Sequence, residues 1–114
     1  MAEKLGDRLR RRRNDKKIGL REAAGKLGIS PTYLSRIETN EERPPAEEVL
    51  KAMAELLDEN FDELMTMAGR IPSDVAEYIG SDPGLPQFLR TARERNLTAQ
   101  DLTASLQNKP KGRK

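Results

Sequence analysis

The sequence has 114 residues, 35% of them charged and 35% hydrophobic, which suits one ordinary domain or a small domain with an extension. The absence of His and Cys excludes Ser–His triads, thiol nucleophiles, disulfides and zinc sites built on imidazole or thiolate. Aromatic residues are scarce while Leu, Ala, Glu, Lys and Arg abound, so a mainly helical chain is predicted. No apolar run approaches the ~20 residues that span a bilayer, so we expect a cytoplasmic protein without a membrane partner.

Charge is distributed unevenly, although the net charge is only +2. Residues 1–36 hold eleven Lys/Arg and four Asp/Glu, a net charge of +7. Residues 37–70 hold three Lys/Arg and ten Asp/Glu, a net charge of −7. Residues 71–114 hold seven Lys/Arg and five Asp/Glu, a net charge of +2. A basic first part followed by an acidic part predicts a polarised molecule whose basic side binds a polyanion.

Apolar spacing predicts five helices in the first seventy residues. They are expected at residues 5–13, 20–27, 31–37, 49–57 and 61–68. Gly28 suits the left-handed stop after the second helix. Ser30 as N-cap and Pro31 as first residue open the third helix, and Asn60 is the expected N-cap of the fifth.

The composition changes at Gly69, and two or three further short helices are predicted after it. Val75 and Ile79 mark the first of them, and Thr98 is the expected N-cap of the last. The expected apolar stripe of this segment consists of Leu85, Phe88, Leu89, Ala92, Leu102 and Leu106. Residues 109–114 contain no apolar side chain and are expected to form a disordered basic tail. The predicted domains are therefore 1–69, 70–108 and 109–114.

The segment LREAAGKLGISPTYLSRIET, residues 20–39, is the most informative motif. It predicts two short helices that meet at a tight turn. Ala23 and Ala24 are small where the helices would cross, and Gly28 tolerates a positive φ in the turn. Three apolar residues then anchor the second of these helices to the rest of the domain: Ile29, Leu34 and Ile37.

Residues 5–68 resemble the helix-turn-helix domain of the phage-repressor/Cro-like regulators, the Xre family. The segments LGISPTYLSRIE and ERPPAEEVLKAMAELL carry this resemblance. It implies an all-α fold, with a five-helix lambda-repressor-like helix-turn-helix domain followed by the two or three short C-terminal helices. It also implies that the third helix enters the major groove of double-stranded DNA, usually in a dimer. No enzymatic activity, cofactor or metal is expected.

The resemblance places the base-reading positions at Pro31, Thr32, Tyr33 and Arg36. Arg36 is the only basic residue of that helix, and a guanidinium binds guanine O6 and N7 bidentately. Thr32 can form a hydrogen bond with a base or offer its methyl group to thymine. Phosphate contacts are expected from the amides that begin the second helix and from the following side chains: Arg10, Arg21, Ser30, Asn40 and Arg43.

Some charged residues have structural explanations. The resemblance implies that Arg13 pairs with Glu38 inside the domain. Helix dipoles and solvated faces explain the acidic set better than a metal site does; the set is Glu47, Glu48, Glu55, Glu59 and Glu63. Two features depart from the family pattern. Gly19 stands where a Ser or Thr N-cap is common, and Glu41 and Glu42 must point away from the DNA backbone.

The predicted function is a sequence-specific DNA-binding transcription regulator, a dimeric repressor of a pseudopalindromic operator. Residues 70–108 are too few to bury a stable core alone, so their stripe is expected to form the homodimer. The alternative is an antitoxin-type regulator whose stripe binds a toxin, or a metallopeptidase that inactivates it. A basic RNA or membrane binder is a weaker alternative, since Leu5 and Leu9 give too small an apolar face for a membrane.

Overall fold

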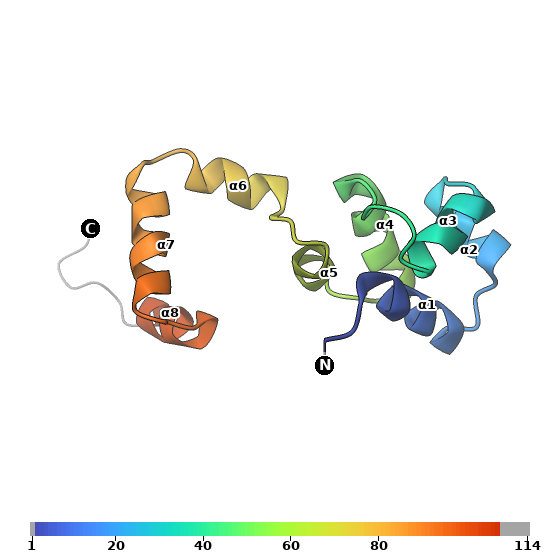
Figure 1. Cartoon of the computed structure of the whole chain (residues 1–114), viewed down its shortest axis with the longest axis horizontal. Helices are drawn as coiled ribbons and strands as arrows, with labels where there is room; N and C mark the ends of the chain where they lie inside the picture. Colours follow the sequence, from blue (N-terminus) through green and yellow to red (C-terminus); the bar gives the residue numbers. More distant parts are fainter. Residues whose placement is uncertain (1, 108–114) are drawn as a thin grey trace. The chain divides into compact units, whose positions relative to one another are not determined.

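The structure, a computed structural model, describes residues 2–107, and every regular element in that range is a helix. It divides into two units, Met1–Pro72 and Ser73–Lys114 (Figure 1). The first unit contains α1 (Leu5–Asp15), α2 (Leu20–Leu27), α3 (Pro31–Glu38), α4 (Glu47–Leu57) and α5 (Phe61–Met67). The second contains α6 (Ser73–Ile79), α7 (Gly84–Glu94) and α8 (Ala99–Leu106). The predicted all-α class is confirmed, and the predicted tail at 109–114 lies outside the described residues.

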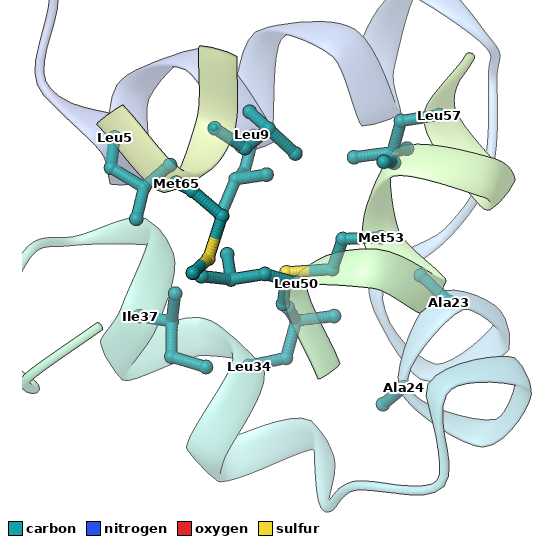
Figure 2. Close-up of a cluster of buried hydrophobic side chains, with 12 residues drawn as sticks. Leu5, Leu9, Ala23, Ala24, Leu34, Ile37, Leu50, Met53, Leu57 and Met65 are labelled. Atoms are coloured by element: carbon teal, nitrogen blue, oxygen red, sulfur yellow. The ribbon is translucent and has the colours of Figure 1, made fainter. Parts of the chain in front are cut away.

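The core of the first unit is built from one side of each of its five helices. Figure 2 shows side chains from α1, α3, α4 and α5 pointing into a common interior, with Ala23 and Ala24 of α2 beside them. The buried set is Leu5, Leu9, Ala23, Ala24, Leu34, Ile37, Leu50, Met53, Ala54, Leu57, Leu64 and Met65. Each large side chain in it contributes about 1.5–3 kcal/mol of burial free energy, so α3 is held on a well-filled interior.

The turn between α2 and α3 has the predicted geometry. Gly28 adopts φ +74°, and the amides of Gly28 and Ile29 donate to the carbonyls of Gly25 and Ala24 at 3.3 and 3.0 Å. No atom lies within 4 Å of where a Cβ of Gly28 would be. Glycine is therefore favoured at this position by the positive φ and not by a lack of space. Ser30 then accepts a hydrogen bond from the Tyr33 amide at 3.0 Å, which starts α3 at Pro31.

The second unit has regular helix ends but little interior. Asn96 has φ +57° after α7, and the Leu97 amide donates to the Ala92 carbonyl at 2.9 Å. Thr98 and Asp101 form a reciprocal capping box at the start of α8. Within residues 73–107, Ala92 is the only buried side chain. None of the helices in the described range is long and apolar enough to cross a bilayer.

Candidate nucleic-acid interface

The two polar residues expected to read bases lie on one side of α3. Thr32 and Arg36 are four residues apart, which places them on the same helix face, and both are exposed. Tyr33 is half-buried and packs against the core, so much of its ring covers apolar surface. Pro31 is also half-buried and begins the helix. The exposed positions of this face therefore offer the Thr32 hydroxyl and the Arg36 guanidinium.

Glu42 lies beside that guanidinium. Its Oε2 is 3.2 Å from Nε of Arg36, and the two side chains are 35% and 54% exposed. Glu41 and Glu42 are expected from the sequence to point away from the DNA backbone. The Glu42 carboxylate points towards Arg36, the principal candidate for base reading. Its neighbour Glu41 is exposed, and its carboxylate has no partner within residues 2–107.

The turn after α3 is tied to the start of α1. Asn40 adopts φ +62°, its Oδ1 accepts a hydrogen bond from the Gly6 amide at 3.0 Å, and its Nδ2 donates to Asp7 at 3.2 Å. Gly6 allows this close approach, because a Cβ there would lie 2.3 Å from the Ile37 carbonyl oxygen. Asn40, expected as a phosphate contact, thus has most of its amide engaged inside the protein. The sequence reasoning missed Gly6, whose partners lie more than thirty residues away.

Three of the arginines expected to contact phosphate have free heads. Arg10, Arg21 and Arg43 are exposed, and their guanidinium groups form no hydrogen bond or ion pair within the described range. Arg10 lines a surface hollow of about 210 Å³ together with Leu20, the first residue of α2. No side chain caps the amides that begin α2, since Gly19 is its N-cap. Arg10 and the uncapped start of α2 therefore meet at this hollow, whereas Arg21 and Arg43 do not line it.

The other arginines of α1 have internal partners. Arg13 donates to Glu38 from Nε at 2.7 Å and from Nη2 at 2.9 Å, which confirms the implied pair. Hydrogen bonding to Glu38 raises the pKa of Arg13 above its usual value. Arg12 donates to the Leu57 carbonyl at 3.0 Å and lies 2.8 Å from Glu59.

A network of Arg8 and three acids joins α1 to the α4–α5 region. Arg8 lies 2.8 Å from Glu3, 3.0 Å from Glu59 and 3.4 Å from Glu63. Hydrogen bonds from Arg11 and Arg8 lower the pKa of Glu3 from 4.5 to about 2. Glu59 and Glu63 therefore have a structural role as ion-pair partners of Arg8, in addition to the helix-dipole and solvation roles expected from the sequence. The described residues contain no group of three or more acidic side chains arranged to hold a metal ion.

A small helical unit with a glycine turn, a fixed third helix and an exposed polar face on that helix defines a helix-turn-helix DNA-binding protein of the lambda-repressor type. Residues 4–64, more than half of the chain, match the family model described as "Helix-turn-helix domain". The chain belongs to this helix-turn-helix family, whose repressor-type members regulate transcription. No curated protein matches the chain.

Solved structures share the fold. The P22 c2 repressor in complex with synthetic operator 9T is 30% identical, with 55% of this chain and 94% of that chain covered and a TM-score of 0.51. A chain of the SinR protein/SinI protein complex is 23% identical, with 90% of this chain and 91% of that chain covered and a TM-score of 0.51. The clp gene regulator ClgR from Corynebacterium glutamicum is 24% identical, with 82% and 92% covered and a TM-score of 0.50. The last two likenesses bear on the fold alone.

Proposed function

We propose that the protein is a dimeric repressor that reads a pseudopalindromic operator with α3. The observation that carries the proposal is the exposed pair of Thr32 and Arg36 on one face of a helix held by its capped start and by the Arg13–Glu38 pair. Support comes from the P22 c2 repressor, which is similar over the same unit and is itself bound to a synthetic operator. A rigidly held helix with two exposed polar side chains suits major-groove reading.

The roles within the helix differ by chemistry. Arg36 binds a guanine through O6 and N7, and Thr32 reads a neighbouring base by its hydroxyl or methyl group. Tyr33 and Pro31 contribute apolar surface at the start of the helix, with the Tyr33 hydroxyl available to a phosphate. Sequence preference is therefore concentrated on the base pair that faces Arg36.

Phosphates are held by the residues around the reading helix. Arg10, Arg21 and Arg43 supply the charge, and the uncapped amides at the start of α2 supply oriented donors. The side chains of Ser30 and Asn40 have structural roles, because Ser30 caps α3 and Asn40 ties the following turn to α1. The second amide hydrogen of Asn40 is then left for a phosphate.

The second unit supplies the dimer contact. Its stripe is largely uncovered, with Phe88 54%, Leu89 41% and Leu106 83% exposed, while Ala92 is buried and Leu85 and Leu102 are half-buried. A two-fold pair covers both copies of such a stripe at once. The alternative, an antitoxin-type regulator, places a toxin or a metallopeptidase on the same stripe.

Duplex binding tests the proposal directly. The full chain should bind a fragment from its own upstream region in the nanomolar range and bind random duplex far more weakly. Three free arginines per protomer give about six phosphate contacts per dimer, so log K should fall against log salt with a slope of about −5. Equal affinity for random duplex, or a slope near zero, would remove the proposal.

A further inference from the structure

We propose that Glu42 is a positioning residue for Arg36 and thereby sets how strictly α3 reads its base pair. The inference rests on the proposed function, because it assumes that Arg36 faces a base. Its basis is the juxtaposition of Glu42 Oε2 and Arg36 Nε at 3.2 Å, with one residue on the reading helix and the other in the loop that follows it.

Backbone hydrogen bonds bring the loop back to the helix. The Glu41 amide donates to the Arg36 carbonyl at 2.8 Å, and the Asn40 amide donates to the Ile37 carbonyl at 3.1 Å. This is the left-handed helix stop, with Asn40 at φ +62° in the position that requires it. Because the chain reverses at that residue, Glu42 lies alongside the last turn of α3.

Side-chain contacts hold the same turn from outside. Asn40 is bound to the Gly6 amide and to Asp7, so the turn is anchored to the first turn of α1. Gly6 is the residue that lets α1 lie this close to the end of α3, because a Cβ there would be 2.3 Å from the Ile37 carbonyl oxygen. Glu42 therefore starts from a fixed backbone, and its carboxylate is a defined partner for the guanidinium.

The chemistry of the pair explains how it favours one base. An arginine has many rotamers, and ordering them on binding costs free energy that a pre-oriented side chain does not lose. The Glu42 carboxylate forms an ion pair on the Nε side of the guanidinium, and Nη1 and Nη2 have no partner within the described range. Those two groups form the end of the guanidinium that spans guanine O6 and N7. In solution the pair is weak, but it strengthens when the groove excludes water.

Glu42 also places a negative charge near the phosphates, and that effect must be separated from positioning. Glu41 is a matched control, since it is the adjacent residue, carries the same charge and has no side-chain partner within the described range. Loss of charge at either position raises affinity for every duplex by a similar factor. Loss of positioning affects only the base pair that Arg36 reads.

The experiment compares Glu42→Gln and Glu41→Gln in the full chain. Binding is measured by fluorescence anisotropy on a duplex selected from a random pool by the wild-type chain, and on its single base-pair variants. Both substitutions should tighten binding to random duplex by about twofold. Glu42→Gln should also reduce discrimination at the Arg36 base pair by about two- to fivefold, while Glu41→Gln leaves it unchanged. In an Arg36→Ala background, the two substitutions should have equal effects.

Three results would overturn the inference. If Glu42→Gln discriminates at the Arg36 base pair as strongly as the wild type does, the pair does not orient Arg36. Increased discrimination would mean that Glu42 competes with the base. A large fall in Tm for Glu42→Gln alone would assign the residue to the fold. If the wild-type chain itself selects no duplex, the proposed function fails first, which is a different and recognisable result.

Discussion

Arg13 and Glu38 form a two-point ion pair inside the first unit, with Nε–Oε2 and Nη2–Oε1 distances of 2.7 and 2.9 Å. The Glu38 side chain is only 4% exposed, and Arg13 also donates from Nη1 to the Ile18 carbonyl at 2.9 Å. The pair therefore joins α1 to the end of α3 and to the turn before α2. It thereby ties the end of α3 to the rest of the first unit.

Arg13→Gln should lower the free energy of unfolding by about 3 kcal/mol, because it leaves the buried Glu38 carboxylate without a countercharge. Arg11→Gln is the control, since Arg11 pairs with Glu3 and Asp15 on the surface, and it should lose clearly less stability. Urea denaturation at neutral pH measures both. Equal losses would show that burial of the Arg13 pair adds nothing.

Glu3 gives the stability a dependence on acid pH. Its pKa is about 2 in the folded chain against an ordinary value of 4.5, so the folded state favours the ionised carboxylate. That contribution is complete above pH 4.5 and is lost as the pH falls towards 2. Glu3→Gln should therefore be less stable than wild type at neutral pH, with the difference closing near pH 2. Thermal melts across this range test it, and a difference that stays constant down to pH 2 would contradict it.

The local features of the fold followed from short-range rules. The cap at Ser30, the positive φ of Gly28, the stop at Asn96 and the capping box at Thr98 each depend on residues within a few positions of one another. The helix order followed from apolar spacing, because each helix of the first unit must bury one face. These rules sufficed to place α3 and its exposed polar residues.

Contacts between distant segments could not be read in the same way. The Gly6–Asn40 hydrogen bond joins residues 34 positions apart, and nothing in the spacing of either residue indicates the other. Arg8 likewise reaches Glu59 across 51 positions. The direction of Glu42 depends on the left-handed turn at Asn40, which the sequence allows without requiring. Such contacts are set by how the helices pack, after their local structure is decided.

Two helical glycines should respond oppositely to alanine. Gly6→Ala places a Cβ 2.3 Å from the Ile37 carbonyl oxygen and 2.8 Å from that of Glu38, so α1 and α3 must separate. Gly25 has no atom within 4 Å of its Cβ position and lies within α2. We expect Gly6→Ala to destabilise by about 1–3 kcal/mol and Gly25→Ala to stabilise by about 0.4–1 kcal/mol. Two changes of the same sign in urea denaturation would contradict the close approach.

Arg36 and Arg43 should separate base reading from phosphate binding. Arg36→Ala should cost about 1–3 kcal/mol on the selected duplex and relax preference at one base pair of each half-site. Arg43→Ala should weaken all duplexes about equally and make the salt slope shallower by about one for each phosphate that is no longer bound. Anisotropy on a full base-substitution series distinguishes the two patterns. If both variants give the same pattern, the division between reading and clamping residues is wrong.

Phe88→Asp should convert the proposed dimer to a monomer. Phe88 is 54% exposed on α7, and Leu89 beside it is 41% exposed, a patch that a soluble monomer seldom leaves uncovered. A charge at its centre would be buried without a partner in a two-fold pair, so the pair should separate. Gln87→Asp is the control, because it adds the same charge at the adjacent, exposed position of the same helix. Light scattering at tens of micromolar measures the mass.

The monomer should also bind the selected duplex much more weakly, because the second half-site is no longer bound intramolecularly. A wild-type monomer, or a dimer that survives Phe88→Asp, would place the contact elsewhere or assign the stripe to a different protein.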